Sequence, residues 1–191
     1  MKYNYRGKTI PQSARQSANE EILRLIASGQ AEDAGVTKED IFNFYTGDGG
    51  LHGLQANAFA DYNTFKLAKQ EMENGQFFTP PPVCDFIIQC LQITASDLVA
   101  DLTCGSGNFI NSLPVEENVY GCDNDSKAIH VARYLYPDAH LENVDIRTYR
   151  PPEEFDFIVG NPPYNLKWWV EDDIINGGDV LSQAYYCQKA A

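Results

Sequence analysis

The sequence lacks a long apolar run, and this absence limits what the protein can be. No stretch approaches the roughly 20 consecutive apolar residues that a membrane-spanning helix needs. Residues 1–6 also lack the apolar core of a secretion signal. We therefore expect a cytoplasmic protein that is not inserted in a membrane.

Positive charge is also scarce. The chain has 14 Lys and Arg against 27 Asp and Glu, which gives a net charge of −13. Proteins that bind nucleic acids neutralise phosphates with basic side chains. Charge alone therefore argues against a nucleic-acid partner. Any DNA-binding surface must be local, or must lie on another segment or subunit.

Metal-ligating residues are few. The five cysteines are odd in number and form no Cys-x-x-Cys pair, and only three histidines accompany them. A structural zinc site or a disulfide framework would need paired ligands. We expect no metal, and cysteines that stay reduced and mostly buried. They are Cys84, Cys90, Cys104, Cys122 and Cys187.

The first part of the chain is predicted to be helical. Apolar residues recur at helical spacing over residues 13–28, and Thr37 followed by acidic residues is typical of a helix N-terminus. A long amphipathic pattern covers residues 54–74, and Gly75 begins a proline-rich hinge. We therefore expect a helical N-terminal region over residues 1–74 and a second domain over residues 75–191.

From residue 83 the pattern changes to alternating helices and apolar strands, which is typical of a parallel sheet. The fold class predicted is α/β: a doubly wound parallel sheet, Rossmann-like. Four strands make a small sheet, and a helix from Asp179 runs to the last residue, so we expect a fragment truncated at its C-terminus. The expected strands are 98–102, 119–122, 140–143 and 155–159, and the expected helices are 83–93, 109–113 and 126–134.

A glycine-containing loop follows the first expected strand. Residues 101–107 read Asp-Leu-Thr-Cys-Gly-Ser-Gly, and Gly105 and Gly107 permit a tight turn and close approach of a ligand to the backbone. In a doubly wound sheet, ligands bind at the carboxyl ends of the strands. Ile110 stands where a third glycine would complete a dinucleotide fingerprint, so a pyrophosphate site is not indicated. We expect Asp101, Thr103 and both glycines to line a cofactor.

Acidic residues end the next two strands as well. Asp123 lies where an acidic side chain binds ribose hydroxyls, and Asp145 is placed to accept from an adenine amino group. Acids at three successive strand ends suit an adenosine with a cationic tail and no phosphate. S-adenosylmethionine (SAM) fits better than NAD or ATP. Asn124 is either a cofactor contact or a helix cap, and for Asp125 a cap is favoured.

The fourth strand runs into Asn161-Pro162-Pro163-Tyr164. The Asn161 side-chain oxygen and the Pro162 carbonyl could accept both hydrogens of a planar amine. This would free the nitrogen lone pair for attack on a methyl group without a strong base. Tyr164 could stack on a base flipped out of its duplex. The competing interpretation is a proline-rich turn after a strand.

Together these motifs resemble the amino-methyltransferases. The segment Gly75-Gln76-Phe77-Phe78-Thr79-Pro80 makes the chain similar to N6-adenine DNA methyltransferases of the gamma arrangement, which include the modification subunits of type I restriction systems. The resemblance covers residues 54–164. It implies that Phe77, Thr79 and Pro80 surround the methionine end of SAM, that Asp145 and Ile146 hold the adenine of SAM, and that residues 161–164 hold the target adenine.

The resemblance implies methylation of adenine N6 in double-stranded DNA for restriction–modification. A recognition domain outside this chain, and a specificity subunit, would be its partners. Three alternatives stay open: a methyltransferase for a protein glutamine amide, one for guanine N2 in RNA, and an inactive or partner-dependent fragment. The glutamine enzymes also carry Asn-Pro-Pro-Tyr, but residues 76–80 are expected only in the DNA enzymes.

Overall fold

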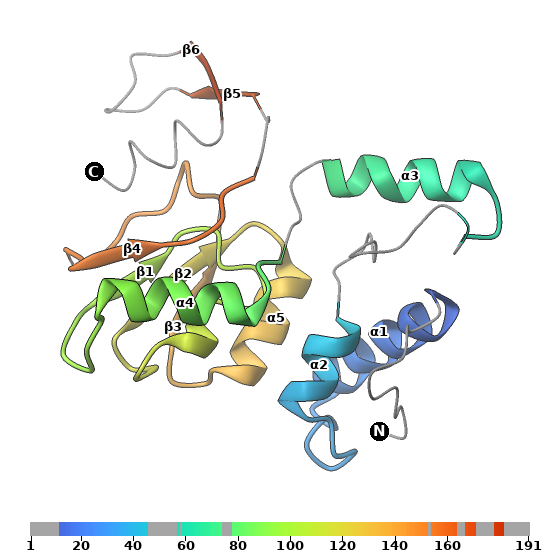
Figure 1. The fold of residues 1–191 in the computed structure, drawn as a ribbon, viewed down its shortest axis with the longest axis horizontal. Coiled ribbons are helices and arrows are strands. Elements are labelled where there is room, and N and C mark those ends of the chain that lie inside the picture. Colours follow the sequence, from blue (N-terminus) through green and yellow to red (C-terminus); the bar gives the residue numbers. More distant parts are fainter. Residues whose placement is uncertain are drawn as a thin grey trace. The chain divides into compact units, whose positions relative to one another are not determined.

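The computed structural model describes residues 12–45, 57, 59–73, 78–152, 154–163, 167–170 and 178–181. The chain divides into two compact units, Met1–Gln76 and Phe77–Ala191. The first contains helices, and the second contains the sheet (Figure 1).

Unit 1 has three described helices, α1 (Gln12–Ala27), α2 (Lys38–Phe44) and α3 (Tyr62–Glu73). The prediction that Thr37 caps α2 is confirmed. The Thr37 hydroxyl accepts from the Asp40 N–H at 3.1 Å, and the Asp40 carboxylate accepts from the Thr37 N–H at 3.0 Å. This reciprocal pair satisfies two backbone donors that a helix start leaves exposed. Ala18, Ile22 and Leu25 of α1 and Ile41 and Phe44 of α2 are buried.

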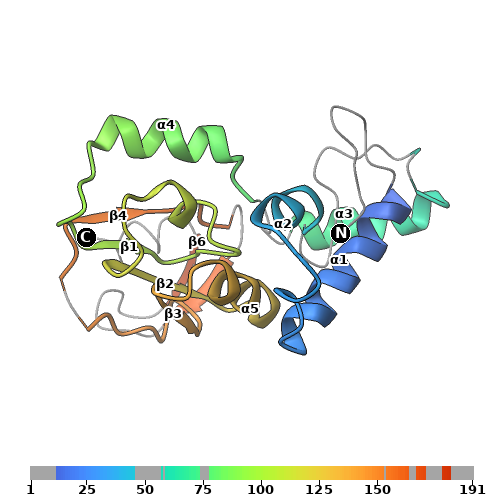
Figure 2. The same ribbon diagram turned by 90° about the horizontal axis from the view of Figure 1, so that it is seen from below.

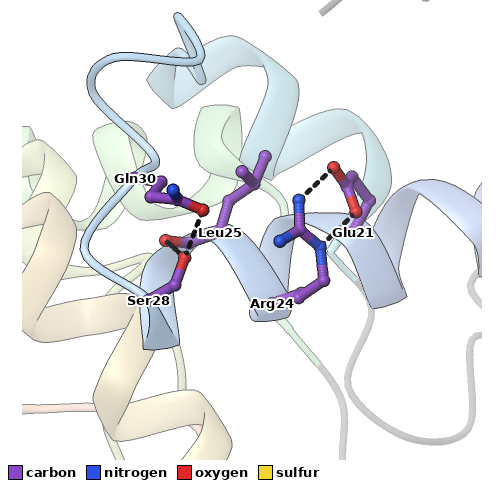
Figure 3. A network of polar contacts seen from close by, with 5 residues as sticks. All are labelled: Glu21, Arg24, Leu25, Ser28 and Gln30. Carbon is purple, nitrogen blue, oxygen red and sulfur yellow. Dashed lines mark hydrogen bonds and ion pairs between the residues drawn. The ribbon is translucent and has the colours of Figure 1, made fainter.

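The end of α1 is stabilised locally. The Arg24 guanidinium contacts the Glu21 carboxylate at 2.8 Å, and the Ser28 hydroxyl donates to the Leu25 carbonyl at 3.1 Å and lies 3.1 Å from the Gln30 amide oxygen (Figure 3). The ion pair is exposed, so water screens it and it contributes little to stability. Gly29, with φ of 68°, then ends the helix in the left-handed conformation.

The start of α3 corrects a prediction. A helix was expected from Leu54, but residues 59–61 are bends and the helix begins at Tyr62. The Asp61 carboxylate accepts from the Thr64 N–H at 2.8 Å and so caps the helix at that point. Amphipathic spacing does not reveal such a cap. Residues 54–56 and 58 lie outside the described residues.

Unit 2 contains a four-stranded parallel sheet. Its strands are β1 (Val99–Asp101), β2 (Val119–Asp123), β3 (His140–Asn143) and β4 (Phe157–Val159), in the order β3-β2-β1-β4. Figure 2 shows the strands side by side in this order. The order reverses at β1, so the sheet is wound in both directions and its switch point lies between β1 and β4. The predicted α/β class with a parallel sheet is confirmed.

One face of this sheet is covered by helices. Val99 pairs with Val119 in register, so both side chains point to the same face. Val99 packs with α4 (Pro81–Leu91), and Val119 packs with α5 (Ser126–Leu135). A short 3-10 helix, η2 (Ile110–Ser112), lies between β1 and β2 and adds Ile110 to this core.

The opposite face is covered by the connection between β3 and β4. Ile146, Tyr149 and Phe155 of this connection pack on Ala100 and Tyr120. Cover on both faces was expected, and on this face a loop supplies it. Pro151-Pro152 interrupts the connection, and proline disfavours helix both at its own position and at the preceding residue.

The described part of the chain has two further strands, β5 (Lys167–Val170) and β6 (Gly178–Leu181), which pair antiparallel. The helix expected from Asp179 is therefore wrong over residues 179–181. Trp168 pairs with Val180 and Trp169 with Asp179, and aromatic and β-branched residues favour strands. Residues 182–191 lie outside the described residues.

None of the described helices combines the length and apolar character needed to cross a membrane. Within the same ranges, no group of three or more His, Cys, Asp or Glu side chains is arranged to hold a metal ion.

Candidate functional site

The glycine loop and the Asn161 segment leave the same edge of the sheet. β1 and β4 are parallel neighbours, and Asp101 pairs in register with Val159. The loop that follows Asp101 and the segment Gly160–Pro163 therefore emerge side by side. This is the switch point, where open α/β sheets bind their ligands.

Asp101, at the end of β1, is almost fully buried, with 2% of its surface exposed. Its carboxylate accepts from the Thr103 N–H at 3.2 Å. Burial raises the pKa of Asp101 to about 7, the charge of Asp123 adds to the rise, and the Thr103 bond opposes it. A cation beside this carboxyl would favour its charged form.

Asp123, at the end of β2, binds the glycine loop. Its carboxylate oxygens accept from the Gly105 N–H at 2.8 Å and from the Asp125 N–H at 2.9 Å. Burial raises the pKa of this carboxyl above its usual range, although these bonds favour the charged form. Asp123 therefore fixes the loop next to the position predicted for a ribose.

The two residues after Asp123 differ in their surroundings. Asn124 is exposed at the bend after β2. The Asp125 carboxylate accepts from the Lys127 N–H at 2.9 Å and from the Ala128 N–H at 3.2 Å, which confirms it as the cap of α5. The ligand contact expected of Asn124 stays a prediction.

The two glycines of the loop serve different packing needs. Both have positive φ, 53° at Gly105 and 87° at Gly107. A Cβ at Gly105 would lie 3.1 Å from the Phe78 ring, and one at Gly107 would lie 2.4 Å from the Tyr136 ring. The Tyr136 ring thus fills the space that a side chain at Gly107 would need. Contact of either glycine with a ligand stays a prediction.

The Phe78-Thr79-Pro80 segment lies against the glycine loop. Besides the Phe78–Gly105 approach, the Asn108 amide nitrogen donates to the Thr79 carbonyl at 2.8 Å. Two motifs that the sequence suggested separately are therefore in contact. Sequence reasoning missed Asn108, since an asparagine after the second glycine reads as ordinary loop. Phe77 lies outside the described residues.

Asp145, after β3, differs from the other two acids. Arg147 holds both of its oxygens, with Nε at 2.9 Å from Oδ1 and Nη2 at 2.5 Å from Oδ2. The Arg147 hydrogen bonds hold the pKa of Asp145 below its usual range, although partial burial opposes them. An adenine amino group would have to share this carboxylate with Arg147. The contact between Arg147 and Asp145 was not predicted from the sequence. Ile146 is buried in the core beneath the sheet.

On the acceptor side, Asn161, Pro162 and Pro163 are half-buried. Gly160 has φ of 154°, a conformation that side chains rarely adopt, which explains the glycine at the end of β4. Tyr164 lies outside the described residues.

The residues at this edge fit SAM. The Thr103 hydroxyl oxygen is buried and, within the described residues, has no hydrogen-bond partner, so a bound ligand could satisfy it. The buried Asp101 carboxyl suits a cationic tail, and the Asp123 carboxylate is of the kind that accepts from ribose hydroxyls.

The chain is similar to known DNA methyltransferases. It is 32% identical over 103 residues to the type II methyltransferase M.CvrRI of Paramecium bursaria Chlorella virus XZ-6E, covering 52% of this chain and 27% of that protein. It is 28% identical over 139 residues to the type I restriction enzyme MjaVII methylase subunit of Methanocaldococcus jannaschii, covering 60% and 23%. The chain spans about a quarter of the length of these relatives.

Among solved structures, the type I restriction–modification methyltransferase subunit from Streptococcus thermophilus overlaps 93% of this chain and 51% of its own. The TM-score is 0.46 and the identity 18%, so this overlap supports no conclusion about individual residues. The family model described as N-6 DNA Methylase matches residues 61–188, about two thirds of the chain. The chain therefore belongs to the N-6 DNA methylase family.

Proposed function

We propose that this chain carries the cofactor-binding and catalytic part of a SAM-dependent methyltransferase that acts on the N6 amine of adenine in DNA. The observation that carries the proposal is the pairing of β1 with β4. It brings the glycine loop, suited to the methyl donor, next to Asn161, suited to the acceptor. Family membership implies SAM as the donor and DNA as the substrate.

On the donor side, each residue has a separate role in this proposal. Bound SAM supplies a methyl group on a positively charged sulfur. Asp101 accepts from the ammonium of the methionine tail, where a cation lowers its raised pKa and favours the carboxylate. Asp123 accepts from the ribose hydroxyls, and Asp145 and the backbone of Ile146, whose side chain is in the core, border the adenine. Phe77, Thr79 and Pro80 surround the tail, and Asn124 and the two glycines complete the border.

On the acceptor side, the role of the protein is to reshape an amine. The lone pair of an adenine amine is delocalised into its ring. Asn161 accepts one amine hydrogen and the Pro162 carbonyl accepts the other, which favours a tetrahedral nitrogen with an available lone pair. Pro163 stiffens this turn and Tyr164 stacks on the flipped base. Transfer forms the bond from nitrogen to the methyl carbon and breaks the bond from that carbon to sulfur, which leaves as a neutral thioether. The methylated amine then releases its proton to water, so no strong base is required.

This activity would serve restriction–modification, because a methylase subunit of a type I restriction enzyme is among the proteins similar to this chain. A specificity subunit and a recognition domain outside this chain would then read the DNA sequence. The acidic balance of the chain, with a net charge of −13, agrees with a basic DNA surface elsewhere.

Methyl transfer from radiolabelled SAM tests the proposal. The chain is incubated with unmethylated DNA and, separately, with a glutamine peptide. We expect label in N6-methyladenine, and a loss of about 100-fold or more in the Asn161→Ala variant because one amine acceptor is removed. SAM binding by this variant should be unchanged. Transfer to the peptide and not to DNA would establish the glutamine-methylating alternative instead.

A second outcome of this assay separates the two halves of the proposal. Binding of SAM without transfer to DNA or peptide would keep the cofactor site and support the inactive or partner-dependent fragment. Repeating the assay with DNA already methylated at N6 supplies the control, since the acceptor position is then blocked.

A further inference from the structure

The segment Phe78–Pro80 leads into α4, whose first two residues are also prolines. Residues 80–82 are three consecutive prolines, which carry no backbone N–H. Thr79 is the last residue before them, and its carbonyl points back to the glycine loop, where Asn108 donates to it at 2.8 Å. The three prolines cannot donate a backbone hydrogen bond to a neighbouring segment. The Asn108 side chain, 29 residues further along the chain, instead ties Thr79 to the glycine loop.

The Asn108 amide is itself oriented. The Ser106 hydroxyl donates to the Asn108 Oδ1 at 3.0 Å, and Ser106 is 3% exposed. With the oxygen bound to Ser106, the amide nitrogen is directed to Thr79. The Cys84 thiol, 3.8 Å from the same Thr79 carbonyl, makes a longer and weaker contact. The Asn108 bond is therefore the stronger of the two.

Close packing supports the same contact. The Phe78 ring lies where a Cβ at Gly105 would be 3.1 Å away, so the glycine leaves room for the segment to approach the loop. Asp123 fixes Gly105 from the other side through its N–H, at 2.8 Å. The segment, the loop and β2 thereby form one continuous chain of contacts.

We propose that Asn108 is a positioning residue that holds residues 78–80 in place around the methionine tail of SAM. This rests on the proposed function, because that function assigns Thr79 and Pro80 to the tail. Asn108 fixes the segment before the ligand arrives, which lowers the entropy lost on binding. Its effect is therefore specific to ligands that have the tail.

Two ligands that share the adenosine but differ in the tail test this inference. The chain is titrated by calorimetry with S-adenosylhomocysteine, which has the amino-acid tail, and with methylthioadenosine, which lacks it. We expect Asn108→Ala to weaken S-adenosylhomocysteine binding about tenfold, as loss of one oriented hydrogen bond does. Binding of methylthioadenosine should change less than about twofold.

A matched control comes from Asn118, just before β2. Its amide nitrogen donates to the Ala95 carbonyl at 2.8 Å. This is the same type of bond, at the edge of the sheet where the strands begin rather than where they end. Asn118→Ala should leave both affinities unchanged. Ser106→Ala, which removes only the orienting bond, should also weaken S-adenosylhomocysteine binding, by a smaller factor. This variant replaces Asn108→Ala in the test if Asn108→Ala does not fold.

Equal weakening of both ligands, or no change in either, would overturn the inference and leave the proposed function standing. If the folded wild-type chain binds neither ligand, the proposed function itself is overturned, and the inference with it.

Discussion

Acidic residues follow the carboxyl ends of β1 and β2, and another follows the carboxyl end of β3, yet these two regions differ in their electrostatics. We refer to them as the β1–β2 end and the β3 end. Asp101 and Asp123 both accept from backbone N–H groups of the glycine loop after β1, and burial raises the pKa of both. Asp145 is held by the side chain of Arg147, which lowers its pKa. Similar positions in the sequence therefore produce opposite shifts.

The difference has a physical cause. Asp101 and Asp123 are more deeply buried than Asp145, and burial is the main cause of their raised pKa values, which neutral backbone donors offset only in part. Asp145 is partly exposed and accepts from a guanidinium, which carries a full positive charge. The β1–β2 end can thus be stabilised by a cationic ligand. The β3 end already has its cation within the protein.

The largest expected effect is at Asp123. Asp123→Ala removes the acceptor for the Gly105 and Asp125 N–H groups and, in the proposal, for the ribose. We expect SAM affinity to fall by about 100-fold or more, since several hydrogen bonds to one charged group are lost together. Calorimetric titration measures this.

Asp97→Ala is the control for that change, because the Asp97 carboxylate also accepts from a backbone N–H, that of Thr94 at 2.6 Å, in the turn before β1. It should not change SAM affinity. Equal affinities for wild type and Asp123→Ala would remove the functional distinction between the two ends.

The next effect concerns the packing of the glycine loop. Gly107→Ala should lower the free energy of unfolding by about 2–4 kcal/mol, because the new methyl group would lie within the Tyr136 ring and φ is positive. Gly35→Ala has a similar φ of 67° and nothing within 4 Å, so it should cost only about 1 kcal/mol. Denaturant unfolding measures both. Equal losses would show that Tyr136 moves aside freely.

A pH dependence should distinguish Asp101. Its folded pKa of about 7 exceeds its usual value of 3.8, so the folded state retains a proton that the unfolded chain releases. The contribution of Asp101 to wild-type stability should therefore fall as pH rises from about 4 to about 7 and stay constant above that range.

Asp101→Asn lacks this titration and should be more stable than wild type by about 1–3 kcal/mol above pH 7. Denaturant unfolding at pH 5 and pH 8 measures the difference between the two proteins. A difference that does not change with pH would contradict a buried, titrating Asp101.

The smallest effect is expected at the β3 end. Arg147→Met should return the Asp145 pKa toward its usual range, which carbon-detected NMR titration of the carboxyl can follow. In the wild type, the lowered pKa gives stability that is present above the usual pKa and lost as pH falls through the lower one. Because this pair is partly exposed, the stability change should be below about 1 kcal/mol. If the pKa of Asp145 is the same in Arg147→Met and in the wild type, Arg147 does not control that pKa.

Much of the sheet could be predicted from sequence. The alternation of short strand segments with helical patterns located the four parallel strands, and the acids after them followed from where the strand segments end. The start of α3 and the β5–β6 pair were not predicted, because Asp61 capping and the pairing of Trp168 with Val180 depend on local bonds that periodicity does not encode.

In the site, the sequence indicated which residues stand at the strand ends but not their neighbours. Tyr136 against Gly107, Arg147 on Asp145 and Asn108 on Thr79 are all contacts of side chains. Two of them join segments about 30 residues apart. They depend on how α5 and the hinge pack around the loop, and no spacing rule contains that information.

The most direct test of the central claim, that the ends of β1 and β2 bind the methyl donor, is the amide NMR signal of Gly105 during titration with S-adenosylhomocysteine. The Gly105 N–H is bound to Asp123, so ligand on that carboxylate should shift its signal, while Gly35 in unit 1 should not move. A Gly105 signal that stays unchanged at saturating ligand, in a folded chain, would contradict the account.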